Sequence, residues 1–255
     1  RTDTNIRFYT DDQIKKIMNV SILVKHGYRV SKIDKMSNDE IHDIIAQLLL
    51  NTDNDFEIKT LVIAMIKMDE YKFDSILNDN IERNGLLNAV TSLVYPFLMH
   101  IGVLWGTSKI MPAQEHFVSS IIRKKIFSKI DNLPAPKKDA KKLVLFLPEE
   151  EHHEIGLLLA YYIARSMGCR VFYLGQNVPT SNIAQVITIT KPDLLLTMMI
   201  TVAEEKVENI LNIILEEFNI TILLAGNIQQ YNNKRLDEVK VLIKPQDLIK
   251  YLEGN

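Results

Sequence analysis

Residues 143–156 read LVLFLPEEEHHEIG, a sequence that joins a continuous apolar run to a polar loop and the start of a helix. The run Leu143–Leu147 is typical of a strand buried on both faces. In the loop, a carboxylate precedes a histidine by two residues, at Glu151 and His153. Such a carboxylate can accept a hydrogen bond from one ring nitrogen and leave the other free to bind a metal. Gly156 stands three residues further on, where a missing side chain lets a bulky ligand approach the backbone.

The sequence after this run alternates short apolar segments with amphipathic helices, which predicts a parallel sheet with helices on both faces. Further strands are predicted at Arg170–Leu174, Leu194–Ile200, Ile220–Leu224 and Val239–Ile243, and helices at Ile155–Met167, Ser181–Ile187, Glu204–Phe218 and the end of the chain. We therefore expect an α/β Rossmann-like (flavodoxin-like) domain with a five-stranded parallel sheet over residues 140–255. Such sheets bind ligands at the carboxyl ends of their strands. Neither GxGxxG nor a Walker P-loop occurs, which argues against the common nucleotide-binding forms of this fold.

Before the proline- and lysine-rich linker Leu133–Lys142 the spacing of apolar residues is helical. Helices are predicted at Asn38–Asn51 (with Ser37 as its cap), Asp55–Met68, Tyr71–Glu82, Leu86–Thr107 and Pro112–Ile130. The last four predict a four-helix bundle over residues 51–132. The most apolar part, Ser92–Trp105, is shorter than the ~20 residues of a membrane span, so we expect a buried helix and no membrane.

The composition restricts the kinds of metal site that the chain can form. Thirty Lys and Arg against 32 Asp and Glu give a net charge of -2, and the single cysteine, Cys169, excludes a disulfide scaffold or a cysteine-rich zinc site. Zinc held by protein alone needs three or four ligands, which this sequence supplies poorly. A cofactor that brings its own metal and equatorial ligands needs only one protein nitrogen, and this describes a corrinoid. No targeting segment is visible, so we expect a cytoplasmic protein.

The string Glu151-x-His153-x-x-Gly156 resembles the cobalamin-binding motif of methionine synthase and its relatives. The resemblance implies that His153 replaces the cofactor's own dimethylbenzimidazole base as the lower cobalt ligand, oriented by Glu151. It also implies that the detached nucleotide tail enters the Rossmann-like domain.

Two later motifs of that family differ in this chain. The Ser-x-Leu after the third strand is replaced by Thr197 and Met198, and the Gly-Gly after the fourth strand by Ala225 and Gly226. By resemblance, Thr197, Met198 and Gly226 stand at positions that contact the nucleotide tail. These differences leave the cobalt ligand in place but affect the tail contacts.

Upstream, Trp105 is followed after nine residues by Glu115 and His116. This spacing resembles the helical cap over the upper face of cobalamin in CarH-type light-dependent repressors. The resemblance implies that Trp105 and Glu115 hold an adenosyl group, that His116 helps to cover this face, and that the cobalamin lies between bundle and Rossmann-like domain. CarH-type photoreceptors carry a histidine directly after the tryptophan, where this chain has Gly106, which leaves open whether light is the signal.

The first 36 residues carry eight Lys and Arg against four Asp, a local positive charge expected of a DNA contact. Residues 1–50 resemble the second half of a MerR-type winged helix. The resemblance implies that Arg7 and Tyr9, as the Arg-x-Tyr of the wing, contact DNA phosphates, and that the helix-turn-helix precedes Arg1.

Together these features predict a MerR-type transcriptional regulator that binds double-stranded DNA and a cobalamin (adenosylcobalamin or methylcobalamin). We expect a homo-oligomer, because such proteins read two half-sites as dimers, and no enzyme activity. Two alternatives remain: a corrinoid carrier module of a methyltransferase, which shares the bundle and the histidine loop, and a regulator of this family that has lost cobalamin binding, which the changes at Met198 and Ala225 motivate.

Overall fold

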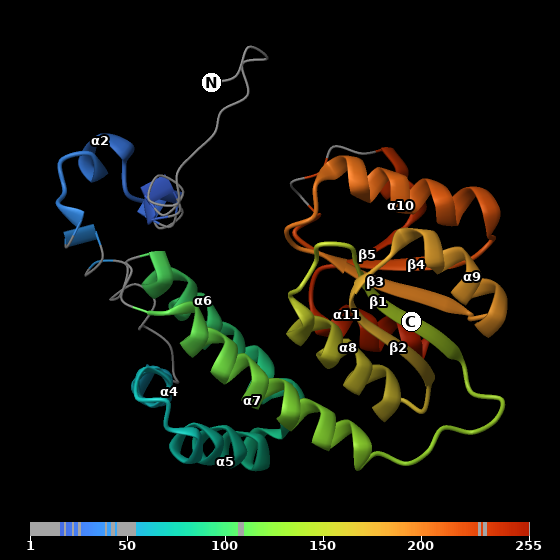
Figure 1. Ribbon diagram of the computed structural model, residues 1–255, viewed down its shortest axis with the longest axis horizontal. Helices are drawn as coiled ribbons and strands as arrows, with labels where there is room; N and C mark the ends of the chain where they lie inside the picture. The colour runs from blue at the N-terminus through green and yellow to red at the C-terminus, as the bar shows by residue number, and fades with distance from the viewer. Residues whose placement is uncertain are drawn as a thin grey trace. The chain divides into compact units, whose positions relative to one another are not determined.

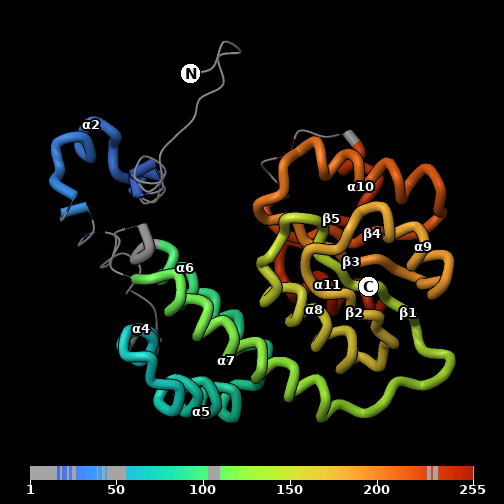
Figure 2. Tube along the Cα trace, viewed as in Figure 1, coloured from blue at the N-terminus to red at the C-terminus, as the bar shows by residue number. Residues whose placement is uncertain are grey.

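The computed structural model describes residues 16–17, 19–21, 23–24, 27–38, 40–41, 44, 55–106, 110–228, 231 and 234–254, and it divides the chain into two compact units (Figures 1 and 2). The first unit ends at Ile121 and the second begins at Ile122, within one long helix. Most of the predicted winged-helix segment, including Arg7 and Tyr9, lies outside the described residues.

Residues 16–44 contain the short helix α2 (Val30–Ile33) and a small apolar cluster built from Leu23, Ile33 and Ile41. The predicted cap at Ser37 is confirmed. The Glu40 backbone N–H donates to Ser37 Oγ (3.2 Å) and the Ser37 N–H donates to Glu40 Oε2 (2.8 Å), which is the reciprocal pattern of a capping box. Much of the predicted helix that follows lies outside the described residues.

The helical unit consists of α4 (Asp55–Ile66), α5 (Glu70–Ala89), the π-helical turn η1 (Val90–Val94), α6 (Tyr95–Gly106) and the first half of α7 (Pro112–Asp131). The helix boundary predicted between residues 82 and 86 corresponds to Gly85, whose φ of +76° and ψ of 160° are not helical. Apolar side chains spaced at helical intervals meet in the core, where the rings of Phe73 and Phe97 pack edge to face at 5.3 Å. The predicted helical region is confirmed.

Burial within the helical unit, rather than length, supports the predicted buried helix at Ser92–Trp105. By length and composition alone, the helical segment Glu70–Gly102 (33 residues, interrupted at Gly85) is the one in the described part of the chain that could cross a membrane. Burial is the better criterion: 44% of its most apolar window is buried inside the protein, and Val94, Phe97 and Ile101 lie in the core. Core helices of soluble proteins pass the same test of length and composition.

The second unit is a five-stranded parallel sheet with the strand order β2-β1-β3-β4-β5. Its elements are β1 (Lys142–Pro148), α8 (Glu154–Ser166), β2 (Arg170–Val178), α9 (Thr180–Thr190), β3 (Leu194–Met199), α10 (Glu204–Glu217), β4 (Thr221–Gly226), the 3-10 turn η3 (Lys234–Glu238), β5 (Lys240–Leu242) and α11 (Pro245–Glu253). This order is that of flavodoxin-like folds, so the predicted class is confirmed.

Helices cover both faces of the sheet, with α9 and α10 on one face and α8 and α11 on the other (Figure 1). The first face buries alternate strand residues such as Phe146, Leu195 and Leu224 against Ile187 and Ile210 of the helices. Because every central strand is apolar on both faces, polar residues concentrate in the loops at the strand ends.

Strand β2 continues four residues past its predicted end at Leu174. Its pairing with β1 shifts by one residue between Tyr173 and Gly175, which is a β-bulge, and polar residues then continue the strand to Val178. Because polar residues follow the bulge, the apolar run in the sequence ends at Leu174, before the strand itself ends. The extension brings Asn177 beside the loop that follows β1.

Candidate functional site

The loop between β1 and α8 lies where the sheet reverses its direction of growth. The chain runs from β1 outward to β2, then returns past β1 to β3, so the loops after β1 and β3 diverge on opposite sides of the sheet. In open α/β sheets this switch point is the usual ligand-binding crevice. Residues 149–153 form the first loop and residues 200–203 the second.

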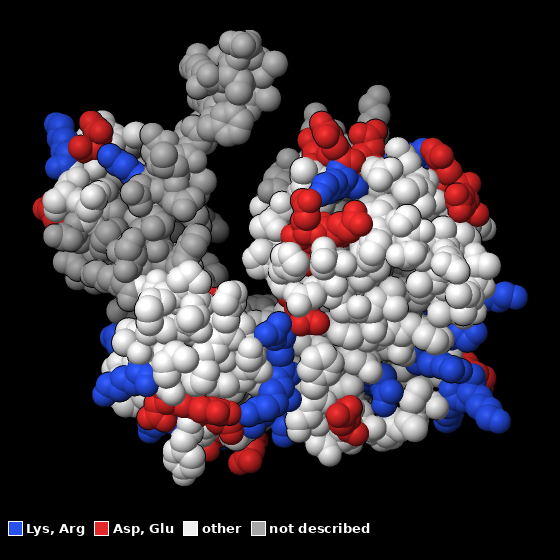
Figure 3. Space-filling view, viewed as in Figure 1, with Lys and Arg blue, Asp and Glu red and all other residues white. Residues whose placement is uncertain are grey.

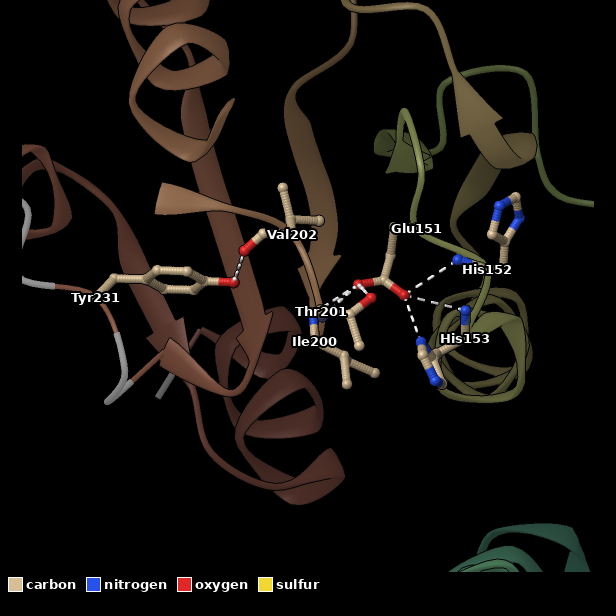
Figure 4. Close-up of polar contacts among 7 residues, drawn as sticks. All are labelled: Glu151, His152, His153, Ile200, Thr201, Val202 and Tyr231. Carbon is tan, nitrogen blue, oxygen red and sulfur yellow. Dashed lines mark hydrogen bonds and ion pairs between the residues drawn. The ribbon is translucent and has the colours of Figure 1, made fainter. Parts of the chain in front are cut away.

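Glu151 joins these two loops through both of its carboxylate oxygens (Figure 4). Oε1 accepts from the backbone N–H groups of His152 (3.0 Å) and His153 (3.1 Å) and contacts His153 Nδ1 at 2.6 Å. Oε2 accepts from the backbone N–H groups of Ile200 and Thr201 (2.8 Å each) and from the Thr201 hydroxyl (3.3 Å). The side chain is fully buried. One carboxylate therefore satisfies polar groups that come from both sides of the switch point.

These contacts keep Glu151 ionised. Burial by itself would raise the pKa of this carboxyl, but the hydrogen bonds from Thr201, His153 and Ile200 outweigh burial and lower the pKa from 4.5 to about 2. A buried carboxylate with this many donors is a fixed negative charge at neutral pH. It favours the His153 tautomer that carries its proton on Nδ1.

His153 presents its second ring nitrogen, Nε2, outward. The residue stands at the N-cap of α8, its side chain is 55% exposed, and among the described residues no group hydrogen-bonds to Nε2. With Nδ1 held by Glu151, Nε2 is the ring nitrogen that remains available to bind a metal. The ring of the neighbouring His152 points away from that of His153 in Figure 4, so the two imidazoles do not converge.

The loop is also fixed from the β2 side. The Glu150 backbone N–H donates to Asn177 Oδ1 (3.0 Å), and the Asn177 N–H donates to the Glu151 carbonyl (3.3 Å). Lys206, from α10, forms an ion pair with Glu150 at 2.6 Å. Asn177 could not be predicted from the sequence as a partner of this loop, because only the bulge-extended part of β2 brings it there.

Beside His153, a polar and aromatic cluster ties α8 to β2 and to the end of α7. The Tyr173 hydroxyl donates to Glu154 Oε1 (2.8 Å), and Arg123 approaches Glu154 Oε2 at 3.5 Å. Tyr161 stacks on Tyr173 with ring centroids 4.9 Å apart, and Phe127 packs edge-on at 5.9 Å. Burial, with the bond to Glu154, raises the pKa of Tyr173, which stays neutral. The cluster supports the turn that presents His153.

Thr197 lies in β3, paired with Phe146 of β1 and Leu224 of β4. Its side chain is fully buried and Oγ1 has no hydrogen-bond partner. A buried hydroxyl without a partner costs roughly 1–3 kcal/mol, so this atom is a candidate to receive a ligand group at the switch point. The neighbouring Met198 is half-buried.

Gly226 ends β4, where its backbone approaches β3 closely. With φ at +116°, a Cβ atom at this position would lie 2.3 Å from the Met199 carbonyl oxygen. The Asn227 N–H then donates to the same oxygen (3.0 Å). Only glycine fits this geometry, so Gly226 has a structural role whether or not it contacts a cofactor. Ala225, which precedes it, occupies a regular β position paired with Met198.

The other predicted site residues lie in the helical unit. Trp105 stands at the end of α6, and its side chain is outside the described part of the structure. Glu115 and His116 lie in the first turn of α7, with His116 Nδ1 3.1 Å from Glu115 Oε2 and the Ser119 hydroxyl donating to Glu115 Oε1 (2.6 Å). These residues therefore come from a different unit than His153.

The donor set fits a cofactor that carries its own metal. Within the described ranges, no three His, Cys, Asp or Glu side chains are placed to hold a bare metal ion. The site does offer one oriented imidazole nitrogen at His153 and an unpartnered hydroxyl at Thr197. These residues fit a corrinoid, which would take one nitrogen from His153 and one polar contact from the Thr197 hydroxyl.

Comparison with known proteins supports this assignment. Residues 57–127 match the family model described as "B12 binding domain". The chain is 27% identical over 200 residues to the "HTH-type transcriptional repressor CarH" of Myxococcus xanthus, an alignment that covers 76% of this chain and 66% of that protein. The chain thus spans just under two thirds of the length of this relative.

The fold also occurs among solved structures. The Methanosarcina barkeri monomethylamine corrinoid protein matches with a TM-score of 0.63 at 17% identity, covering 79% of this chain and all of that one. This likeness shows the fold. The predicted resemblance to CarH-type repressors and the predicted cofactor, a cobalamin, are confirmed by the family-model match and by the similarity to the Myxococcus xanthus repressor. The chain thus carries a segment, residues 57–127, that is similar to the B12 binding domain family, and it is similar to a CarH repressor along about three quarters of its length.

Proposed function

We propose that this chain is part of a DNA-binding transcriptional regulator whose effector region binds a cobalamin through His153. The observation that carries the proposal is the 2.6 Å contact between His153 Nδ1 and the buried Glu151 carboxylate, which leaves Nε2 exposed at the switch point of the sheet. The similarity to a transcriptional repressor supports a regulatory role. We assign no catalytic step to the chain and expect it to act in the cytoplasm.

Different residues of the chain would hold different parts of the cofactor. A cobalamin, when bound, supplies a cobalt whose axial ligands can exchange. His153 would supply a nitrogen to this cobalt, and Glu151 would fix the tautomer and direction of the His153 ring. Thr197, Met198 and Gly226 are assigned to the nucleotide tail, together with Gly156 in the first turn of α8. By resemblance to CarH-type repressors, Trp105, Glu115 and His116 are assigned to the opposite face of the cofactor.

Replacing Thr197 with valine separates cofactor binding from stability. Valine keeps the shape of threonine but removes the unpartnered hydroxyl, so the cofactor-free protein should be as stable as the wild type or more stable by about 1 kcal/mol. Cobalamin affinity should fall about five- to tenfold, the worth of one hydrogen bond. Urea unfolding and equilibrium dialysis measure the two quantities. Thr197→Ser, which keeps the hydroxyl, should bind normally, and unchanged affinity in Thr197→Val would remove this residue from the site.

The regulatory part of the proposal rests on DNA binding. The wing residues assigned by resemblance are Arg7 and Tyr9, and the partner is double-stranded DNA bound by a homo-oligomer. The full-length protein should retard a duplex that contains its own promoter in a gel-shift assay, and Arg7→Ala should weaken the retardation at every sequence alike, because phosphate contacts carry no sequence information. Cobalamin should change the mobility or the amount of the complex. Absence of any retarded duplex at low salt would contradict the regulatory role.

The alternative function is a corrinoid carrier of a methyltransferase. Its support is the fold that this chain shares with a corrinoid protein. A carrier would bind cobalamin in the same way but would not retard DNA. A regulator without cofactor is the other alternative, and it would retard DNA while retaining no cobalamin in dialysis at tens of micromolar.

A further inference from the structure

The amino-terminal edge of the sheet, opposite the His153 loop, gathers positive charge from five separate segments. Strands β1, β2 and β3 begin at this edge and helices α8 and α9 end there. We call the following residues the basic edge: Lys137, Lys138, Lys141, Lys142, Arg165, Arg170 and Lys191. Figure 3 shows Lys and Arg side chains grouped at the lower right of this unit, whereas carboxylates group over α10 at its top.

Backbone and side-chain hydrogen bonds hold the basic edge together. The Arg170 N–H donates to the Lys141 carbonyl (2.9 Å), and Asp193 and Lys142 exchange two bonds, one through the Asp193 N–H (2.9 Å) and one to its carboxylate (2.7 Å). Arg165 donates to the Pro134 carbonyl (3.0 Å). The segment between α7 and β1 is therefore fastened to the sheet, and its lysines are presented at a fixed place.

The charge of the basic edge is not neutralised within the protein. In the segments around β1, β2 and β3, its seven cations are accompanied by two carboxylates, Asp139 and Asp193, whereas Glu216 and Glu217 lie at the other half of this edge, where α10 ends before β4. Five of the cations are exposed and form no ion pair with any described residue: Lys137, Lys138, Lys141, Arg170 and Lys191. Ion pairs of this unit that the structure describes lie elsewhere, among them those of Arg123, Lys206 and Arg235.

Helix ends explain only part of this arrangement. Cations near a helix C-terminus stabilise the helix dipole, which accounts for Arg165 and Lys191 at the ends of α8 and α9. The three lysines at 137, 138 and 141 lie in a segment that is not helical. They gain nothing from a dipole, and like charges so close together repel one another. An anionic partner removes that repulsion.

We propose that the basic edge is a second DNA contact, which binds the phosphate backbone without reading sequence. This rests on the proposed regulatory function, because DNA is the polyanion that a repressor-like chain meets. Clustered Lys and Arg on one face are the electrostatic footprint of such a contact. The edge is opposite the loop that carries His153, so the cofactor and DNA do not compete for the same end of the sheet.

The test measures how affinity for a duplex of arbitrary sequence depends on salt. Each lost phosphate contact lowers the steepness of log K against log salt by about 0.9. In this chain the triple variant Lys137→Gln, Lys138→Gln, Lys141→Gln should lower the steepness by about 2 to 3 and the affinity at low salt at least about tenfold. The control is Lys59→Gln, Lys67→Gln, Lys72→Gln, which removes the same charge from exposed lysines of the helical unit and should stay close to wild type.

The outcomes are distinct. Equal losses of duplex affinity in the two triple variants would overturn the proposal, because they would show an effect of net charge alone. An unchanged affinity in both variants would overturn it as well. Binding to vesicles that contain anionic lipid, without binding to the duplex, would also overturn it. The cobalamin spectrum of both variants reports on the proposed function separately. If the basic-edge variant shows a normal cobalamin spectrum and the salt dependence of the wild type, the DNA contact at the basic edge is rejected and the cofactor assignment stands. If the basic edge contributes to duplex binding but the protein binds no cobalamin, the cofactor assignment is rejected and the DNA contact stands.

Discussion

Replacing His153 with alanine is expected to abolish the spectral change that accompanies cobalamin binding. In the wild type, adenosylcobalamin should convert to a form whose own base is detached and replaced by a protein imidazole, with a shifted visible absorption. The alanine variant has no nitrogen at this place, since the ring of His152 points elsewhere. Loss of groups that merely orient a metal ligand costs 10–100-fold in affinity, so loss of the ligand itself should cost about 100-fold or more.

The matched control is His152→Ala. His152 is adjacent and exposed, and its backbone N–H, which bonds to Glu151, is retained in the variant. Its spectrum and affinity should equal those of the wild type. If His153→Ala gave the wild-type spectrum while His152→Ala lost it, the ligand would be His152, and if both variants kept the spectrum, neither histidine would hold cobalt.

Replacing Glu151 with alanine is expected to destabilise the cofactor-free protein by about 3–5 kcal/mol. The substitution leaves several backbone N–H groups without their acceptor in a buried place, among them those of Ile200 and Thr201, and each such group costs roughly 1–3 kcal/mol. Urea unfolding followed by circular dichroism measures the loss. Glu150→Ala is the control: that exposed carboxylate pairs with Lys206, and a surface pair contributes less than about 1 kcal/mol. A loss below 1 kcal/mol for Glu151→Ala would show that the two loops are held by something else.

The same residue sets an acid limit to stability. Because the pKa of Glu151 in the folded protein is about 2, below its ordinary value of 4.5, its contribution is fully present above pH 4.5. The contribution should fade as the pH falls from 4.5 toward 2, where the folded carboxylate also takes up a proton. Glu151→Gln, which cannot ionise and serves if the alanine variant does not fold, should show a smaller decline over this range.

The strands of the sheet could be predicted because each central strand is a continuous apolar run. The contact between Glu151 and His153 could be predicted because these two residues lie two positions apart in the chain. The remaining half of the Glu151 contacts was not predictable. Ile200 and Thr201 offer backbone N–H groups, which every residue but proline has, and they lie 49 and 50 residues away. Only the strand order, which places β3 beside β1, brings them within reach.

Two further features of the site could not be predicted from the sequence, for related reasons. The sequence does not distinguish Thr197 from Met198 as the residue at the serine position of the family motif. The pairing of β3 with both of its neighbours buries the Thr197 hydroxyl without a partner, and this pairing follows only from the fold. Glu154, Tyr173 and Arg123 come from three elements, and no local spacing connects them. Sequence patterns report periodicity and nearby pairs, whereas contacts across elements require the topology.

The most direct test of the account is electron paramagnetic resonance of the protein loaded with cob(II)alamin, with its histidines labelled with nitrogen-15. The unpaired electron of the cobalt couples to the nucleus of its lower nitrogen, and nitrogen-14 splits the lines into triplets whereas nitrogen-15 splits them into doublets. If His153 is the lower ligand, the labelled protein gives doublets and the unlabelled protein triplets. Triplets in both would show that the cofactor keeps its own base, and the central claim would be wrong.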